Sequence, residues 1–248
     1  MKTQSNNYEL CIMKNVAIIL AGGSGKRLGG ELPKQFLQVA GKTVMEHSIE
    51  AFERCPEIDE IAIVSRADFV PDVEAMVARA KYNKVKHVLS GGKERYHSSL
   101  AALEAYPESD CNLLVHDCVR PLVSQRIIHD CLEALKRYEA VDVAVPTTDT
   151  IIQLDEHGCI SSIPPRALLR NVQTPQGFRR DTIRRAFDLA LQDPSFEPTD
   201  DCSVIHRYLP EVSIHVVEGD ADNFKITYKS DLERAEMLLS VRVDPFGE

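Results

Sequence analysis

The chain has 248 residues, of which 44% are hydrophobic and 27% are charged, and these proportions are ordinary for a globular protein in water. Its formal net charge of −9 argues against a general nucleic-acid or anionic-membrane surface, so a bound anion must be held by a local cluster of cations. The seven cysteines never occur as C-x-x-C, which argues against a disulfide framework or a zinc knuckle and favours a reducing cytoplasm.

The first segment, residues 1–13, is polar and aperiodic, and we expect a disordered extension there. It has no signal pattern, and no apolar run along the chain approaches the roughly 20 residues of a membrane span, so we expect a cytoplasmic protein without a membrane partner. We expect a single domain over residues 14–240, followed by a short tail at 241–248.

From residue 16 the pattern alternates between apolar runs typical of buried strands and apolar residues at helical spacing. Strands are predicted over 16–21, 58–65, 85–89, 112–116 and 141–145. Helices are predicted over 44–54, 68–81, 96–106 and 124–139, with Asp68 as the N-cap of the second helix and Ser124 as the N-cap of the fourth. This alternation predicts an α/β protein with a doubly wound, mostly parallel sheet, whose ligand lies beyond the carboxyl ends of the strands.

The alternation stops at Thr147. Residues 150–154 and 159–163 flank a turn sequence, Asp155-Glu-His-Gly158, and predict a protruding β-hairpin arm over about 147–166. An isolated hairpin is only marginally stable in water, so this arm packs either on its own subunit or on a second one. Beyond it we expect helices over 180–191, 200–207 and 230–239, and a strand over 213–218.

A glycine-rich segment follows the first strand, with five glycines between Gly22 and Gly30. It fails the G-x-G-x-x-G spacing of dinucleotide-binding loops, and the later Gly41-Lys42-Thr43 lacks the first glycine of a P-loop. A glycine turn after a buried strand can still direct backbone N–H groups at an anion, and Arg27 and Lys34 follow on the same segment. This combination predicts a triphosphate site rather than a solvated loop.

Five stretches in chain order carry a resemblance. They are LAGGSGKRLGGELPKQF from Leu20, SGGKERYHSSLAAL from Ser90, VHDCVRP from Val115, RNVQTPQGF from Arg170 and VEGDADNFKIT from Val217. Together they resemble the cytidylyltransferases that activate sugar-alcohol phosphates, the 2-C-methyl-D-erythritol 4-phosphate and ribitol-5-phosphate cytidylyltransferases. The resemblance implies a Rossmann-like nucleotidyltransferase fold. It also implies attack by a polyol phosphate on the α-phosphorus of CTP, which gives a CDP-alcohol and pyrophosphate.

The resemblance assigns roles to individual residues. As catalytic residues it implies Arg27, Lys34 and Lys225. As CTP-binding residues it implies Ala21, Gly22, Gly23, Gly25, Arg27, Lys34, Gly91, Gly92, Ser98 and Asp117. As acceptor-binding residues it implies Arg120, Thr150, Arg166, Thr174 and Thr199. Asp117 directly follows a predicted strand, where a carboxylate suits Mg²⁺, and Asp222 is expected to share this metal.

Two further expectations concern the arm. In relatives the arm crosses to a partner subunit, so the resemblance implies a homodimer with an acceptor pocket built from two chains. The sequence Ile163-Pro-Pro-Arg166 is closer to the ribitol-phosphate enzymes, which favours ribitol 5-phosphate as acceptor, with 2-C-methyl-D-erythritol 4-phosphate as the alternative.

Two functions of other kinds remain to be weighed. A nucleotidyltransferase that uses another base would share the glycine-rich start, but TPQGF and DNFKIT count against it. A non-catalytic nucleotide-binding regulator would be expected to lack Lys34, Asp117 or Lys225, and the chain has all three.

Overall fold

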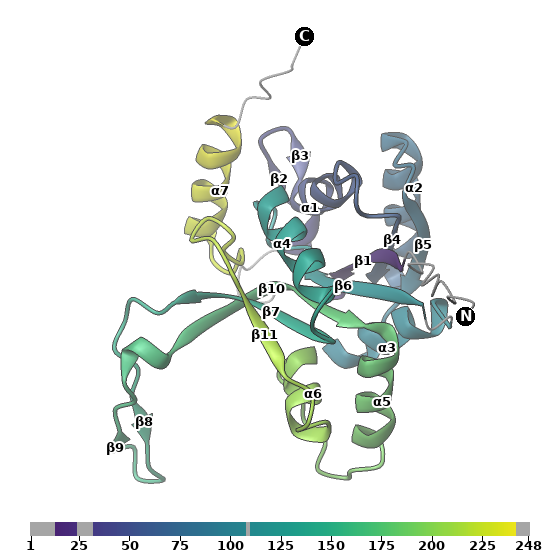
Figure 1. Ribbon diagram of the computed structural model, residues 1–248. Coiled ribbons are helices and arrows are strands. Elements are labelled where there is room, and N and C mark those ends of the chain that lie inside the picture. The colour runs from purple at the N-terminus through teal and green to yellow at the C-terminus, as the bar shows by residue number, and fades with distance from the viewer. Residues whose placement is uncertain (1–12, 24–31, 108–109, 242–248) are drawn as a thin grey trace, which may run out of the picture.

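The computed structural model describes residues 13–23, 32–107 and 110–241 (Figure 1). Within these residues a seven-stranded sheet has the order β11-β7-β10-β6-β1-β4-β5. Its strands are β1 (Lys14–Ala21), β4 (Glu60–Ser65), β5 (Val85–Ser90), β6 (Cys111–Asp117), β7 (Ala140–Pro146), β10 (Arg170–Arg179) and β11 (Ile214–Glu218). The predicted doubly wound, mostly parallel sheet is confirmed.

Strand β1 lies inside the sheet and pairs in parallel with β4 on one side and with β6 on the other. Its aliphatic residues from Val16 to Ala21 are all buried, because helices cover both of its faces. The chain runs from β1 outward to β4 and β5 and then returns to β6 on the opposite side of β1. This reversal creates a crevice at the carboxyl ends of β1 and β6.

Two layers of helices enclose the sheet (Figure 1). One core lies under α1 (Val44–Glu53), α2 (Val70–Ala80), α4 (Gln125–Leu135) and α7 (Lys229–Val241), and the other under α3 (Arg95–Ala105), α5 (Arg180–Ala190) and α6 (Asp201–Tyr208). Capping side chains define several helix starts. Thr43 forms a capping box with Glu46 at α1, and Ser124 accepts the Ile127 N–H at α4 as predicted.

Helix α2 corrects a prediction, because Asp68 is not its N-cap. Asp68 lies in a short 3-10 turn, Ala67–Phe69, and forms an ion pair with Arg66, while α2 begins at Val70 with Phe69 as its N-cap. Pro71 explains the shift, since proline is favoured in the first turn of a helix, where its missing N–H has no partner to lose. The predicted helix over 124–139 is also shorter, ending at Leu135.

Strand β10 was not predicted, although it lies inside the sheet and pairs antiparallel with both β6 and β7. Its sequence contains Pro175 and Gly177, which are uncommon within central strands. The register of its pairing with β7 shifts between Val172 and Gln176, which takes Pro175 out of the regular ladder. At Gly177 a Cβ atom would lie 2.6 Å from a methyl carbon of Val141, so this close packing requires glycine.

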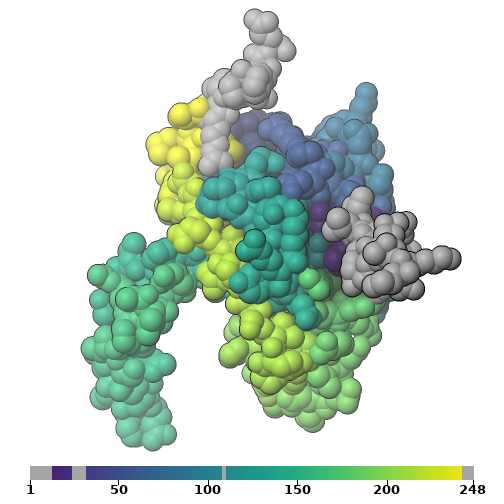
Figure 2. All heavy atoms as spheres, viewed as in Figure 1, coloured from purple at the N-terminus to yellow at the C-terminus, as the bar shows by residue number. Residues whose placement is uncertain are grey.

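The predicted arm is present as a hairpin of β8 (Gln153–Leu154) and β9 (Ile160–Ser162), followed by the 3-10 turn Arg166–Leu168. Figure 2 shows the arm standing away from the body of the subunit. Its exposed large hydrophobic residues are Ile151, Ile152, Leu154, Ile160, Ile163 and Leu168. The arm therefore does not pack on its own subunit. Among the described residues, no helix has the length and hydropathy needed to cross a bilayer.

Candidate active site

A cavity of about 420 Å³ opens at the carboxyl ends of β1 and β6, where the sheet topology places the crevice. Seven of the predicted site residues line it, namely Gly22, Gly23, Lys34, Gly92, Ser98, Asp117 and Lys225. They come from segments spread along the chain between residues 22 and 225. The predictions at Gly25 and Arg27 lie outside the described residues.

The backbone at the end of β1 is bound by a glutamine that the sequence analysis did not single out. The amide of Gln35 donates to the backbone carbonyls of Ala21 at 2.8 Å and of Gly23 at 3.1 Å. Next to it Lys34 is almost fully buried, and its ammonium donates to the Ile226 carbonyl at 2.7 Å. Gly22, Gly23 and the Lys34 side chain all line the cavity.

The opposite wall is the Gly91-Gly92 turn between β5 and α3. A Cβ atom on Gly91 would lie 2.4 Å from the Ser98 hydroxyl, and one on Gly92 would lie 2.5 Å from the His97 Cβ. Neither position has room for a side chain, so the backbone itself forms this wall. The Gly91 N–H donates to the Ser65 carbonyl at 2.7 Å, whereas Gly92 is exposed and its backbone can meet a flat heterocycle or a sugar.

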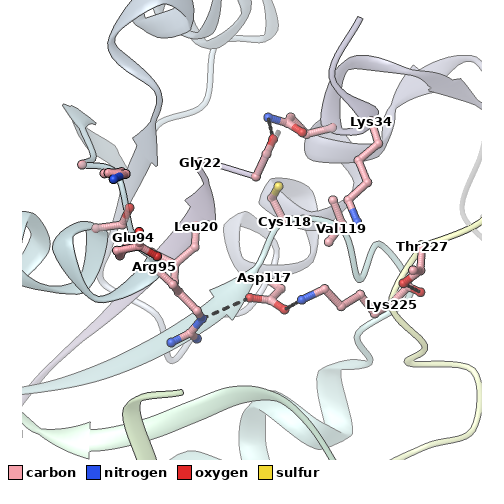
Figure 3. Close-up of a pocket in the computed structure, with 15 residues that line it drawn as sticks. Leu20, Gly22, Lys34, Glu94, Arg95, Asp117, Cys118, Val119, Lys225 and Thr227 are labelled. Carbon is pink, nitrogen blue, oxygen red and sulfur yellow. Dashed lines mark hydrogen bonds and ion pairs between the residues drawn. The ribbon is translucent and has the colours of Figure 1, made fainter. Parts of the chain in front are cut away.

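Asp117, the last residue of β6, lies between two cations (Figure 3). Its Oδ2 accepts from the Lys225 ammonium at 2.8 Å, and its Oδ1 lies 3.8 Å from the Arg95 Nε. Burial raises the pKa of the Asp117 carboxyl, but the charges of Lys225 and Arg95 outweigh burial and hold this pKa well below its usual range. Asp117 is therefore ionised throughout the physiological pH range.

The backbone of Asp117 is fixed from β10. The Thr174 hydroxyl accepts the Asp117 N–H at 3.1 Å and lies 3.0 Å from Nδ1 of His116. Burial lowers the pKa of His116 to about 4, so this imidazole is neutral at pH 7. Thr174, predicted to contact the acceptor, is buried and supports the carboxylate from behind.

Arg120, also predicted to contact the acceptor, is buried beside the same centre. Its guanidinium donates to the Asn223 carbonyl at 2.8 Å, and its Nε has no hydrogen-bond partner among the described residues. Burial lowers the pKa of Arg120, yet an arginine keeps its charge at any physiological pH. It therefore adds a positive charge behind Asp117.

The remaining predicted acceptor residues are not part of the cavity wall. Thr150 and Arg166 are exposed on the arm, where the Arg166 guanidinium donates to the Thr148 carbonyl at 3.2 Å. Thr199 is exposed just before α6. One subunit thus brings the predicted CTP residues together but leaves the arm residues away from them.

Asp117 has the properties of a Mg²⁺ ligand. Mg²⁺ commonly binds through one or two carboxylates together with substrate phosphates, and Asp117 is an ionised carboxylate whose Oδ1 has only a 3.8 Å ion pair to Arg95. Asp222 fits this role less well. It forms an ion pair with Arg234 at 3.0 Å and is not among the residues that line the cavity.

Several residues of the wall were not predicted, chiefly Gln35, Arg95, Cys118 and Thr227. Gln35 and Arg95 lie inside stretches that carry the resemblance, so their positions in those motifs could have identified them as site residues. Burial and the neighbouring Asp117 raise the pKa of the Cys118 thiol, which therefore stays protonated and is a poor nucleophile. The wall thus provides ammonium groups, a guanidinium, backbone amides and one carboxylate, which suit a polyanion with a bound divalent cation.

The chain is similar to known proteins over nearly its whole length. The family model described as "IspD: 2-C-methyl-D-erythritol 4-phosphate cytidylyltransferase" matches residues 15–241. The protein of that name from Thermobifida fusca is 47% identical, and the alignment covers 92% of this chain and 94% of the relative. A bifunctional ribulose 5-phosphate reductase/CDP-ribitol pyrophosphorylase from Haemophilus influenzae is 42% identical, and the alignment covers 92% of this chain and 49% of that relative.

Solved structures of similar proteins have the same fold. The 4-diphosphocytidyl-2C-methyl-D-erythritol synthase of Anaerococcus prevotii superposes with a TM-score of 0.82 at 29% identity, over 92% of this chain and 97% of the other. The 2-C-methyl-D-erythritol 4-phosphate cytidylyltransferase of Thermus thermophilus superposes with a TM-score of 0.73 at 31% identity, over 92% of this chain and all of the other.

Proposed function

The chain belongs to the 2-C-methyl-D-erythritol 4-phosphate cytidylyltransferase family and is a CTP-dependent cytidylyltransferase, and we propose that its acceptor is 2-C-methyl-D-erythritol 4-phosphate. The observation that carries the proposed chemistry is the convergence of Lys34, Asp117 and Lys225 on one cavity beside the glycine turn. The reaction joins an acceptor phosphate oxygen to the α-phosphorus of CTP and releases pyrophosphate.

The choice of acceptor departs from the preference suggested by the sequence around Arg166. That preference was for ribitol 5-phosphate. The relative with ribitol in its name is less similar, at 42% identity, and this chain matches only half of it. The erythritol-phosphate enzyme of Thermobifida fusca is 47% identical and is matched over nearly its whole length. The weight of similarity therefore supports 2-C-methyl-D-erythritol 4-phosphate.

In this proposal the lysines act by electrostatics. Both Lys34 and Lys225 line the cavity and would hold the α-phosphate, so that their charges neutralise the negative charge that builds up as the new P–O bond forms. Asp117 would hold Mg²⁺, which supplies further neutralisation of the triphosphate when it is bound. Positioning and charge supply most of the rate enhancement, because phosphoryl chemistry needs little covalent help from the protein.

We also propose that the arm inserts against a second copy of the chain. Six large hydrophobic side chains on the arm are exposed in the single subunit, and a patch of this kind is typical of a protein interface. The exposed Thr150 and Arg166 lie on this same arm, so dimerisation would carry them toward the partner's cavity. The acceptor site would then need both subunits.

The test is a side-by-side assay of pyrophosphate release with CTP, Mg²⁺ and either acceptor phosphate. We expect kcat/KM for 2-C-methyl-D-erythritol 4-phosphate to exceed that for ribitol 5-phosphate by at least about tenfold, since a pocket distinguishes sugar alcohols by their hydroxyl contacts. Equal or better turnover of ribitol 5-phosphate would refute the proposed acceptor. Failure to turn over either compound would refute cytidylyl transfer to both of these polyol phosphates.

A further inference from the structure

Arg95, which neither the motif roles nor the proposed reaction has used, bridges two carboxylates from distant segments. It is the first residue of α3, three positions after Gly92, and it lines the cavity. Its Nη1 lies 2.5 Å from Oδ2 of Asp201, and its Nε lies 3.8 Å from Oδ1 of Asp117. Figure 3 shows Arg95 and Lys225 approaching Asp117 from opposite sides.

The anchor of Arg95 is rigid. Asp201 begins α6, its side chain is only 1% exposed, and its backbone N–H donates to the Gln176 side chain at 3.3 Å. A carboxylate buried to this degree needs a cation beside it. If the Arg95 guanidinium moved away, the Asp201 carboxylate would be left buried and unpaired, which is strongly unfavourable. Arg95 is therefore a fixed cation.

Lys225 is held much less firmly. It lies in the irregular segment between β11 and α7, its side chain is 41% exposed, and its ammonium bonds the Asp117 carboxylate at 2.8 Å. An exposed lysine has a flexible stem and loses little when it exchanges one anionic partner for another. Lys225 is thus able to move from Asp117 to a phosphate that enters the cavity.

This movement would remove the bonded cation from a buried carboxylate. Arg120 contributes charge nearby, but its guanidinium is bound to the Asn223 carbonyl. Arg95 faces the Asp117 carboxylate directly from the other side. An uncompensated buried carboxylate is strongly unfavourable, so until Mg²⁺ is bound the release of Lys225 depends on a protein cation that remains in place.

We propose that Arg95 is a positioning residue, the fixed counter-charge of Asp117 that frees Lys225 to bind the phosphates of CTP. The proposal rests on the proposed function, because it requires that Lys225 contacts CTP. It goes further by giving the two cations at Asp117 different roles. Arg95 stays in place, anchored on Asp201, and Lys225 transfers to the substrate.

The test is a double-mutant cycle of Arg95→Gln and Lys225→Ala, read as the Kd of CTP by calorimetry in EDTA and as kcat with Mg²⁺ present. With Lys225 in place, Arg95→Gln should weaken CTP binding about tenfold and lower kcat, because Lys225 is then the main cation left to Asp117. In the Lys225→Ala background the same change should alter both values by less than about twofold. Equal effects in the two backgrounds, or no effect in either, would overturn the proposal, since a merely structural role does not depend on Lys225.

Because Arg95→Gln leaves Asp201 buried without its partner, the cycle is repeated with Arg95→Gln/Asp201→Asn, which removes both charges of the pair. The same dependence on Lys225 is expected there. Arg95→Lys keeps the charge and should recover part of the lost CTP affinity, whereas affinity as low as that of Arg95→Gln would count against a role for the charge. Arg185→Gln is the matched control, as Arg185 pairs with Glu211 at 3.0 Å on the surface.

The two readouts separate this inference from the proposed function. Wild-type protein that binds CTP but releases no pyrophosphate with either acceptor refutes the proposed acceptor chemistry, while the cycle in Kd still decides the role of Arg95. Wild-type protein that does not bind CTP refutes both.

Discussion

Replacing Asp142 by asparagine is expected to stabilise the fold at neutral pH and to have little effect at pH 4. Asp142 lies on β7, where its Oδ1 accepts from the Gln176 amide at 3.1 Å. The same amide donates to Oδ2 of Asp200, the N-cap of α6, at 2.9 Å. Burial, with the nearby charge of Asp200, raises the pKa of Asp142 from 3.8 to about 6.

The direction of the pH dependence follows from whether the folded or the unfolded chain binds the Asp142 proton more tightly. Well below pH 3.8, Asp142 is protonated in the folded and the unfolded chain, so it makes no pH-dependent contribution there. Between pH 4 and 6 the unfolded chain loses this proton first and is stabilised relative to the folded chain. At about 1.4 kcal/mol for each pH unit, the fold has lost about 3 kcal/mol by pH 7. Asparagine stays neutral and avoids this loss.

The measurement is urea denaturation at pH 4, 5, 6 and 7, followed by circular dichroism. The free energy of unfolding of Asp142→Asn, minus that of the wild type, should rise by about 2.5 kcal/mol between pH 4 and pH 7. Taking the difference cancels the contributions of the other titrating groups. The exposed Asp72→Asn on α2 serves as the control and should show no such rise. A difference for Asp142→Asn that does not change with pH would refute the reasoning.

Four further predictions concern the reaction and the assembly. Lys34→Ala and Lys225→Ala should each lower kcat about 10²-fold or more in protein that remains folded by circular dichroism, and near-normal turnover would exclude them as catalytic residues. EDTA in excess of Mg²⁺ should abolish turnover, and MgCl₂ should restore it; turnover that persists in EDTA would rule out the metal. Ile160→Asp, on the exposed face of the arm, should convert a dimer to a monomer in light scattering and raise the KM of the acceptor, whereas a wild-type monomer with full activity would contradict the shared site. Gly91→Ala should raise the KM of CTP, because its Cβ would lie 2.4 Å from the Ser98 hydroxyl, and an unchanged KM would show that this wall does not bind the nucleotide.

Much of the fold followed from local patterns. The apolar run from Val16 to Ala21 was recognisable as a strand buried on both faces, and it is fully covered in the structure. Ser124 was recognisable as a helix cap because its hydroxyl acts within three residues of its own position. The hairpin arm was predicted from its turn residues. Each of these features depends on residues close together in the sequence.

Other features depended on distant partners. Strand β10 buries Thr174 and Gln176, whose polar side chains are more typical of a loop. Their hydrogen bonds go to distant groups: Thr174 accepts from the Asp117 backbone N–H, and Gln176 donates to the carboxylates of Asp142 and Asp200. Asp68 was a plausible helix cap by composition, but Pro71 sets the start of the helix.

The candidate site divides in the same way. The types and order of its charged residues, with Lys34, Asp117 and Lys225 as the clearest, were evident from the sequence, because phosphate chemistry requires cations and a carboxylate beside a glycine turn. Their mutual arrangement was not. That Lys225 and Arg95 flank one carboxylate, and that Arg95 is anchored on a residue 106 positions further along the chain, was decided only by the tertiary structure. The strength of a charge interaction depends on distance and burial in three dimensions, and neither quantity is contained in the spacing of residues along the chain.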